Sequence, residues 1–263
     1  MNNGRYYGGC DVGSTTGKAV ILGSEGIVAS SLIPSEIDPE ITARHALEKA
    51  CASVPGLEGI QGLSYLIGTG YGRNEVPFAS ENISEISCHA MGAFWCDPSI
   101  KTIVDIGGQD MKAIALADDG SVREFAMNDK CAAGTGRFFE AMSRIFRMDL
   151  DEFSKLSLSA RKTIPVTAQC SVFAETEVIS LLAKRNPPAD IAAGIQNAVG
   201  KRCFTLLKRV GLKPHLTVTG GCAKNQGLLM ELRRLFQIDI APMTVDPQLI
   251  GALGAAILAS RKK

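Results

Sequence analysis

This sequence of 263 residues contains few aromatic residues and almost no excess of positive or negative charge. Phe, Trp and Tyr make up 6% of the chain, and 28 Lys and Arg against 27 Asp and Glu leave a formal net charge of +1. Proteins that bind nucleic acids usually concentrate positive charge in a patch or stripe. The composition therefore argues against a nucleic-acid partner.

Long hydrophobic runs are also missing. The first residues, MNNGRYYGGCDVG, contain no apolar segment of the kind that a signal peptide needs. The longest weakly polar run, near Leu249 to Ala259, is too short for a bilayer, which takes about 20 consecutive apolar residues. We therefore expect a cytoplasmic protein without a membrane partner.

The eight cysteines include no C-x-x-C pair, and no cysteines and histidines stand at zinc-site spacing. Disulfides are rare in the cytoplasm, so we expect free thiols. Most of these cysteines lie among apolar or small residues, where a buried and inert thiol is the ordinary outcome.

Two stretches of the sequence share one pattern. CDVGSTTGKAVIL begins at Cys10 and VDIGGQDMKAIAL begins at Val104, and both read Asp, aliphatic, Gly, four variable residues, Lys, Ala, aliphatic. Each stretch is expected to form a β-hairpin around a Gly-rich turn. The two copies lie 94 residues apart, which is too far for a solenoid and indicates a duplicated lobe.

A third stretch, LTVTGGCAKNQGLLMEL from Leu216, places two glycines between a predicted strand and a predicted helix. Gly-rich turns and helix starts bind phosphate through backbone N–H groups, and aspartates bind Mg²⁺. We therefore expect an α/β fold with two duplicated lobes, 1–100 and 101–263, around a nucleotide cleft. The C-terminal helix, 249–261, is expected to pack back on the first lobe.

Cys131 and Cys170 each precede a predicted helix. In NDKCAAGTGRFFEAM, the small residues Gly134, Thr135 and Gly136 follow Cys131 and would let a helix start approach a ligand closely. A helix N-terminus stabilises negative charge by roughly 0.3–1 kcal/mol at an exposed site, which favours a thiolate. From the residues alone, both metal ligands and plain helix-start thiols remain open.

In their order, the three Gly-rich stretches resemble the phosphate-1, phosphate-2 and adenosine motifs of the actin, sugar-kinase and heat-shock-chaperone ATPase superfamily. NDKCAAGTGRF, AQCSVFAETEVISLL and NISEISCHAMGA are more specific, and resemble the BadF/BadG/BcrA/BcrD ATPase family. Within it, the sequence is most similar to the activators (component A, archerase) of 2-hydroxyacyl-CoA dehydratases. The resemblance runs from about Tyr7 to Ala259 and implies a ribonuclease-H-like fold for each lobe.

The resemblance further implies an ATP-hydrolysing electron donor of anaerobic metabolism that works as a homodimer. One [4Fe-4S] cluster would be shared by the two subunits, with Cys131 and Cys170 of each as ligands. Since such a cluster takes four thiolates, a two-fold axis would supply the second pair. The acceptor would be a 2-hydroxyacyl-CoA dehydratase, a related double-cubane protein or a benzoyl-CoA-reductase-like enzyme, and the donor a ferredoxin or flavodoxin.

The same resemblance implies roles at an ATP/ADP site. Asp11 and Asp105 would position Mg²⁺ and water, and Gln109 would orient the attacking water. Lys18 and Lys112 are further phosphate-ligand candidates, although each lies on the return strand of its hairpin and can point elsewhere. The nucleotide-binding residues would be Gly13, Ser14, Thr15, Thr16, Gly107, Gly108, Gly134, Thr135, Gly136, Gly220, Gly221, Lys224 and Asn225.

Two other functions fit the same fold. A small-molecule kinase of the sugar-kinase type would use Asp110 as its base, but would give the two helix-start cysteines no role. A nucleotide-binding interaction module without redox activity would keep those cysteines buried. The sequence also departs from familiar family members at Cys222, Lys224 and Gln226, which leaves the ribose and adenine contacts open.

Overall fold

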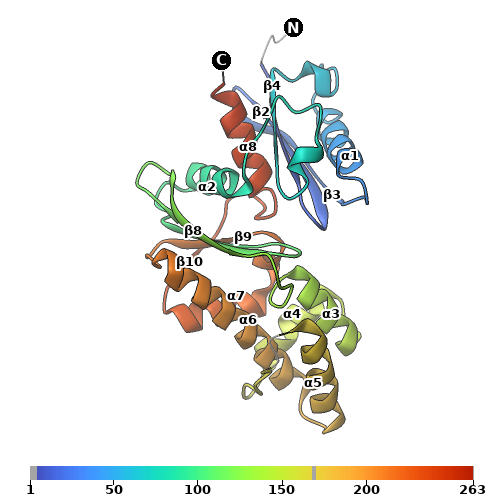
Figure 1. Ribbon diagram of the computed structural model, residues 1–263, viewed down its shortest axis with the longest axis vertical. Coiled ribbons are helices and arrows are strands. Elements are labelled where there is room, and N and C mark those ends of the chain that lie inside the picture. Colours follow the sequence, from blue (N-terminus) through green and yellow to red (C-terminus); the bar gives the residue numbers. More distant parts are fainter. Residues whose placement is uncertain (1–4, 168–169, 263) are drawn as a thin grey trace. The chain divides into compact units, whose positions relative to one another are not determined.

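The structure is a computed structural model that describes residues 5–167 and 170–262. These residues form two compact units, each with its own five-stranded sheet (Figure 1). The first unit extends to Ile100 and also contains Leu116–Arg123 and the chain from Met243 onward, whereas the second contains Lys101–Ala115 and Glu124–Pro242. The sequence-based division at residue 100 placed both Leu116–Arg123 and residues 243–263 in the second lobe, with the C-terminal helix expected to pack back on the first.

The sheet of the first unit has the strand order β3-β2-β1-β4-β5. β1 pairs with β2 in antiparallel orientation and with β4 in parallel orientation. β2 and β3 are antiparallel, and β4 and β5 are parallel. The strands are β1 Tyr7–Val12, β2 Thr16–Gly23, β3 Gly26–Pro34, β4 Tyr65–Thr69 and β5 Glu81–Asn82.

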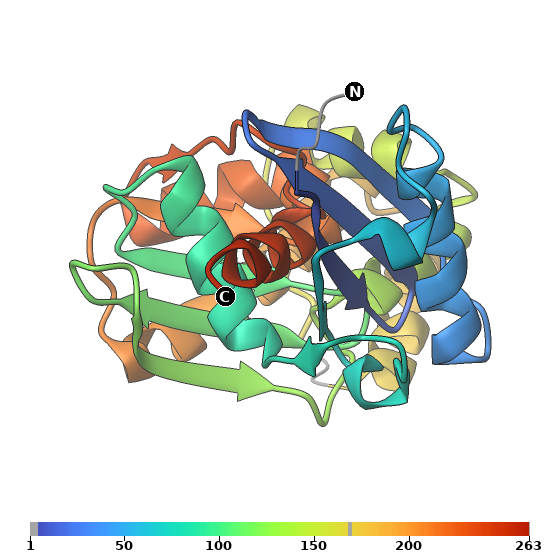
Figure 2. The same cartoon turned by 90° about the horizontal axis from the view of Figure 1, so that it is seen from above.

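Helices cover both faces of this first sheet (Figure 2). α1 (Pro39–Cys51) packs on one face against β2 and β3, whereas α8 (Ile250–Ser260) packs on the other against β1, β4 and α2 (Glu85–Cys96). A side chain at Gly9 would collide with the backbone of α8. The glycine thus lets α8 lie directly on β1, the strand that carries Asp11.

The sheet of the second unit repeats this plan, with the order β10-β9-β6-β7-β8. β6 pairs with β7 in antiparallel orientation and with β9 in parallel orientation, as β1 does with β2 and β4. The duplication predicted from the sequence repeat is therefore confirmed, and so is the α/β fold. The strands are β6 Thr102–Ile106, β7 Met111–Leu116, β8 Val122–Asn128, β9 Leu216–Thr219 and β10 Ile240–Ala241.

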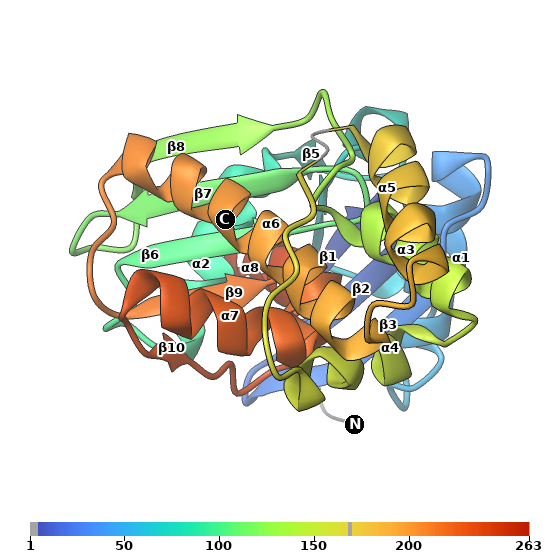
Figure 3. The ribbon, with the colours of Figure 1, turned by 90° about the horizontal axis from the view of Figure 1, so that it is seen from below.

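Helices α6 and α7 pack together across one face of the second sheet, and α3, α4 and α5 lie beside them (Figure 3). α3 contacts both α4 and α5. The helices are α3 Gly136–Phe146, α4 Leu150–Leu156, α5 Ser171–Ala183, α6 Pro188–Val210 and α7 Gln226–Phe236. Four short 3-10 turns complete the described elements: η1 Ile60–Gly62, η2 Arg73–Glu75, η3 Ser157–Ser159 and η4 Gly221–Lys224.

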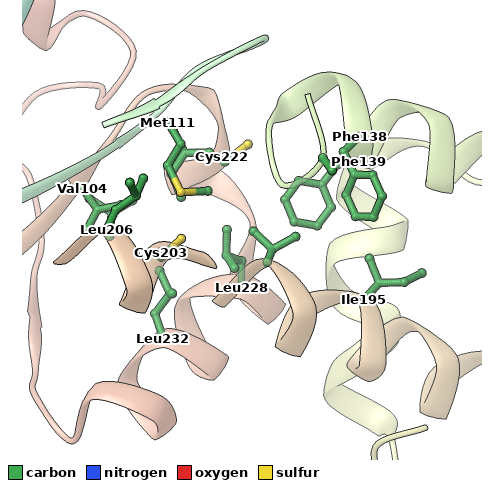
Figure 4. Close-up of a cluster of buried hydrophobic side chains, with 14 of the residues drawn as sticks. Val104, Met111, Phe138, Phe139, Ile195, Cys203, Leu206, Cys222, Leu228 and Leu232 are labelled. Carbon is green, nitrogen blue, oxygen red and sulfur yellow. The ribbon is translucent and has the colours of Figure 1, made fainter. Parts of the chain in front are cut away.

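One apolar core joins the sheet of the second unit to its helices (Figure 4). Val104 and Met111 come from the sheet, Phe138 and Phe139 from α3, and Leu206 from α6. The helical stripe predicted after Cys131 thus becomes the buried face of α3, which fixes the position of the segment that precedes it. Across residues 5–167 and 170–262, no helix is long and apolar enough to cross a bilayer.

Candidate functional site

The turn of the β1–β2 hairpin, which holds the phosphate-1 motif, is fixed by hydrogen bonds within the first unit. The Gly13 N–H donates to the Thr16 carbonyl oxygen (3.0 Å), and the Ser35 hydroxyl donates to the Gly13 carbonyl oxygen (2.8 Å). The side chains of Ser14 and Thr15 are half-buried at this turn. The sequence-predicted phosphate residues of this hairpin therefore lie together, on a turn with a defined conformation.

Each hairpin carries a buried pair of an aspartate and a lysine. Asp11 lies directly opposite Lys18, and Asp105 lies directly opposite Lys112. Opposed residues of an antiparallel pair lie on the same face of the sheet. The lysine Nζ is 3.2 Å from Asp11 Oδ2 in the first hairpin and 3.5 Å from Asp105 Oδ2 in the second. Both lysines thus point at the aspartates and compensate their buried charge.

The second hairpin, which holds the phosphate-2 motif, has additional polar contacts. Lys112 Nζ also lies 2.7 Å from Asp110 Oδ2. The Thr219 hydroxyl, at the end of β9, donates to Asp105 Oδ1 (2.9 Å). Gln109 is exposed at the turn, where its amide can reach a bound molecule. Thr219 precedes the predicted glycine pair, and only the parallel pairing of β6 with β9 brings it beside the aspartate.

Glycines border the carboxylates of both aspartates. A side chain at Gly251 would come within 2.9 Å of Asp11 Oδ2, and one at Gly70 would collide with Asp11 Oδ1. A side chain at Gly220 would come within 2.9 Å of Asp105 Oδ1. The space beside these oxygens is thus kept free of Cβ atoms, and carboxylate oxygens are the ligands that Mg²⁺ prefers. Each aspartate, within its own unit, therefore offers carboxylate oxygens of the kind that binds Mg²⁺.

The adenosine motif forms a tight turn between β9 and α7. Gly220 has φ +81°, a left-handed conformation that glycine adopts without strain. The Asn225 side-chain oxygen caps α7 by accepting the Leu228 N–H (2.9 Å), and it also accepts from the Gln196 amide (3.2 Å). Asn225 thus holds the helix start, and its predicted contact with nucleotide stays a prediction.

Cys222, which stands out in the adenosine motif, belongs to the core. Its side chain is buried in the same cluster as Cys203 and Leu228 (Figure 4). Burial raises the pKa of the Cys222 thiol far above its ordinary value. This departure from the family pattern therefore concerns packing under the turn.

The start of α3 is bonded directly to the phosphate-2 turn. The Gly136 N–H donates to the Gly107 carbonyl oxygen (2.8 Å), and the Arg137 N–H donates to the Gly108 carbonyl oxygen (2.9 Å). The Thr135 N–H donates to the Ala132 carbonyl oxygen (3.0 Å). These hydrogen bonds lie within the chain, and the predicted nucleotide contacts of Gly134, Thr135 and Gly136 stay a prediction. The contact joins the predicted phosphate site to the segment that carries Cys131.

Cys131 is exposed and lies in the segment between β8 and α3. The N-cap of α3 is Thr135, so Cys131 precedes the helix by a short loop and does not cap it. The Asn128 side-chain amide donates to the Cys131 carbonyl oxygen (3.3 Å), which closes this loop. Gly134 within the loop has φ +100°, which favours glycine at that position.

Cys170 is the N-cap residue of α5 and is also exposed. Ahead of it, the Thr167 N–H and hydroxyl both donate to the Glu177 carboxylate, at 3.0 and 2.9 Å. The residues between Thr167 and Cys170 lie outside the described part of the chain. Because α3 packs against α5, the two cysteines precede neighbouring helices.

The other six cysteines are less accessible. Burial raises the pKa of both Cys88 and Cys203 to about 12, and thiols of that kind are unreactive. Cys10, Cys51 and Cys222 are also buried, and Cys96 is half-buried. The structure thus separates the predicted ligands Cys131 and Cys170 from the thiols that the sequence analysis expected to be inert.

Thiolates are the donors that iron–sulfur clusters require, so the two exposed cysteines fit this cofactor in chemical type. In the part of the chain that the structure describes, no group of three or more His, Cys, Asp or Glu side chains is placed to hold a metal ion. A four-iron cluster takes four thiolates. Two cysteines of the chain are exposed, and a cluster shared by two copies stays a prediction.

Comparisons with known proteins match nearly the whole chain. The sequence model of the BadF/BadG/BcrA/BcrD ATPase family matches residues 9–259. The activator of lactoyl-CoA dehydratase from Anaerotignum propionicum is 44% identical over 255 residues, which are 97% of each chain. The (R)-2-hydroxyglutaryl-CoA dehydratase activating ATPase of Acidaminococcus fermentans is 40% identical over 98% of each chain.

Solved structures give the same result. The activator of 2-hydroxyisocaproyl-CoA dehydratase from Clostridium difficile, solved with bound ADPNP, superimposes with a TM-score of 0.89 at 41% identity, over 97% of this chain and 94% of that one. A ROK family glucokinase from Streptomyces griseus reaches a TM-score of 0.55 at 13% identity, over 98% of this chain and 100% of that one. The glucokinase shares the fold alone.

Proposed function

Because the chain belongs to the BadF/BadG/BcrA/BcrD ATPase family, we propose that it couples ATP hydrolysis to the delivery of a low-potential electron to a partner enzyme. The observation that carries the proposal is the exposure of Cys131 and Cys170 before two neighbouring helices, while five of the other six cysteines are buried. The relatives that activate 2-hydroxyacyl-CoA dehydratases support an enzyme of that class as acceptor.

Cys131 and Cys170 would hold a [4Fe-4S] cluster together with the same residues of a second copy. The cluster, when bound, supplies one-electron transfer at a potential set by its surroundings. The face of α5 that follows Cys170 supports a homodimer, since Val172, Phe173 and Ile179 are exposed to 67%, 68% and 55%. A two-fold dimer interface that contains Cys170 would need large exposed apolar side chains beside this cysteine.

The two hairpins would bind the phosphates of ATP with Mg²⁺. Asp11 and Asp105 hold the metal directly or through its waters, and the exposed Gln109 orients the attacking water. Phosphoryl transfer depends mainly on positioning and charge stabilisation, which fixed turns and buried, lysine-compensated carboxylates can provide. Lys18 and Lys112 act on the aspartates at 3.2 and 3.5 Å, and so support the metal ligands.

The bonds from Gly136 and Arg137 to the phosphate-2 turn give the nucleotide a route to the Cys131 segment. A change in the turn that displaces the Gly107 carbonyl must also displace the Gly136 N–H or break a 2.8 Å hydrogen bond. ATP can drive such a change only if it binds the two arrangements with different affinity. We therefore place the coupling of hydrolysis to electron delivery at this contact.

The alternatives have less support. Asp110, which a kinase would use as its base, is bound to Lys112 at 2.7 Å. The kinase structures that match share 13–15% identity and so support only the fold. An interaction module without redox activity was expected to bury both cysteines, yet both are exposed.

Anaerobic purification and EPR spectroscopy of the reduced protein, with and without ATP, test the proposal. We expect a brown dimer with about four iron atoms, the content of one cubane, and an EPR signal that changes when ATP is added. Cys131→Ala and Cys170→Ala should each abolish iron binding, whereas Cys96→Ser should retain it. A colourless wild-type protein that phosphorylates sugars, or only binds nucleotide, would overturn the proposal in favour of one of the alternatives.

If iron is present, electron donors and acceptors can then be compared. Reduced ferredoxin and flavodoxin would be offered as donors. A 2-hydroxyacyl-CoA dehydratase, a related double-cubane protein and a benzoyl-CoA-reductase-like enzyme would be offered as acceptors. We expect ATP-dependent electron transfer to the dehydratase.

A further inference from the structure

An arginine from the long helix α6 reaches the segment that carries Cys131. Arg202 is half-buried, and its guanidinium carbon lies 5.9 Å from the centre of the Phe138 ring. A side chain at Gly134 would come within 3.3 Å of Arg202 Cδ. The arginine stem therefore occupies the space that the glycine leaves, and its head is held between α3 and the loop before it.

The contacts of Arg202 with Gly134 and Phe138 place its charge beside the loop that carries Cys131. Burial lowers the pKa of the Arg202 guanidinium, and the charge of the Cys131 sulfur, followed by that of Cys203, acts in the opposite direction. Cys203 is fully buried, and its thiol stays neutral because burial raises its pKa to about 12. Cys131 is exposed and is the sulfur of the two that is placed to serve as an anionic ligand.

Arginine suits a fixed charge at such a place. Its guanidinium is always protonated in proteins and is more weakly hydrated than an ammonium group, so it keeps its charge when it is half-buried. Contact with the Phe138 ring adds a cation–π interaction that fixes its position. The segment around Cys131 thus has a permanent positive charge behind it, on an element separate from α3 and α5.

We propose that Arg202 is a positioning and charge-compensating residue for Cys131, and that it raises the reduction potential of a cluster bound there. This inference rests on the proposed function, since it presumes that Cys131 binds the cluster. The reduced state of a thiolate-bound cluster carries one more negative charge than the oxidised state, so a nearby cation stabilises the reduced state more. Residues behind the ligands commonly tune metal sites in this way.

A redox titration followed by EPR, on the dimer purified with its cluster, tests the inference. Arg202→Met removes the charge and keeps much of the apolar stem, and we expect a more negative midpoint potential. At a fixed potential the ratio of reduced to oxidised cluster should fall by about threefold to tenfold, tenfold being about 59 mV for a one-electron couple. Arg202→Lys should restore most of the wild-type potential.

The matched control is Lys201→Met, which removes one positive charge from the neighbouring, exposed position of the same helix. It should leave the midpoint potential unchanged. Iron release to a chelator is a second measurement that does not depend on ATPase activity. We expect faster release from the Arg202→Met protein, because the loop around Cys131 loses its support.

The outcomes separate the inference from the proposed function. A wild-type protein without iron overturns both. A wild-type protein with iron, whose potential is the same in Arg202→Met, overturns only the role of Arg202. A potential that shifts equally in Arg202→Met and Arg202→Lys also overturns it, because the effect would then be one of packing rather than charge.

Discussion

The two phosphate hairpins share a sequence pattern and a strand register, but their surroundings differ. Asp11 is opposed by Lys18. Among the ion pairs of the described residues, Lys18 has one carboxylate within 4 Å, that of Asp11. In the second hairpin, Lys112 lies near both Asp105 and Asp110, and Thr219 donates to Asp105 as well. The same motif is therefore a simple ion pair in one unit and part of a polar network in the other.

The turns of the two hairpins also differ in what they contact. The carbonyl of Gly13 accepts from Ser35, which follows a strand of the same sheet. The carbonyls of Gly107 and Gly108 accept from the start of α3. Only the second turn is thus bonded to the segment that bears a candidate cluster ligand. If the proposed function is right, the second turn is therefore the one through which nucleotide binding would act on the Cys131 segment.

The largest expected effects are those of Asp11→Asn and Asp105→Asn on ATP hydrolysis. Each should lower ATP hydrolysis on the order of 100-fold or more, because a charged group that positions metal and phosphate in the transition state is lost. Steady-state ATPase assays at saturating Mg²⁺ would measure this. Similar losses in both variants are expected if both hairpins serve one reaction, and normal activity in either would contradict that.

The same pair of variants should differ in stability. Removing one partner of a buried ion pair lowers the free energy of unfolding by about 3–5 kcal/mol, because the other charge stays buried without compensation. Asp11→Asn removes the carboxylate that compensates the buried charge of Lys18. Asp105→Asn should cost less, because Lys112 keeps Asp110 at 2.7 Å. Thermal unfolding followed by circular dichroism would measure the two melting temperatures. An equal or larger loss for Asp105→Asn would show that the second network does not buffer the lysine charge.

Gly136→Ala tests the coupling role of the second turn. The added Cβ would lie 3.3 Å from both the Gly107 carbonyl oxygen and Gly108 Cα, which is closer than most Cβ contacts. We expect a cost of about 1–3 kcal/mol from overpacking and a weaker response of the cluster EPR signal to ATP, with ATPase activity largely kept. The matched change in the first hairpin is Ser35→Ala.

Ser35→Ala removes the 2.8 Å bond to the Gly13 carbonyl, at a cost of about 0.5–1.5 kcal/mol. It should lower ATP affinity slightly, as measured by nucleotide titration, and leave the EPR response to bound ATP intact. If both variants weaken the EPR response equally, the second turn has no special role in coupling.

Much of this arrangement could be predicted from the sequence. The repeated spacing of aspartate, glycine and lysine predicted both hairpins, because spacing fixes which residues are opposed across a short turn. Cys170 was expected to precede a helix, and it is the N-cap of α5. The orientation of the lysines was not predicted, although direct opposition across an antiparallel pair places both side chains on one face.

Other features depend on contacts that the sequence pattern does not encode. Arg202 lies 71 residues from Cys131 and belongs to no motif, and Glu177 lies seven residues after Cys170 within AQCSVFAETEVISLL, where the motif gives no sign of its contact with Thr167. The small residues before α3 were assigned to a ligand because glycines at a helix start commonly bind phosphate. In the structure, the Gly136 N–H donates to the phosphate-2 turn and the Thr135 N–H donates to the Ala132 carbonyl oxygen, contacts that the sequence pattern does not reveal.

Glu177→Gln provides a smaller test of how the second unit positions its cysteines. The carboxylate accepts from both the N–H and the hydroxyl of Thr167. Its contacts are exposed, so solvent screens them and we expect only about a twofold faster loss of iron to a chelator. Glu175→Gln, on the same helix, is the control and should match the wild type. A slower loss in Glu177→Gln would contradict the role assigned to this carboxylate.

The smallest expected effect concerns the first unit and can identify its unfolding transition. The ion pair with Lys262, followed by smaller contributions, lowers the pKa of Glu81 in β5 below its ordinary value. A carboxyl whose pKa is lowered on folding stabilises the fold above its unfolded pKa of about 4.3, and that contribution is lost as the pH falls through the folded value. Glu81→Gln should therefore lower the melting temperature of the first unit slightly at pH 7, and the difference from wild type should disappear as the pH falls below the lowered pKa of Glu81 in the folded protein. If calorimetry resolves two transitions, the one that shifts should also be the one that Asp11→Asn lowers. A shift in the transition that Asp105→Asn lowers would contradict the assignment of Glu81 to the unfolding of the first unit.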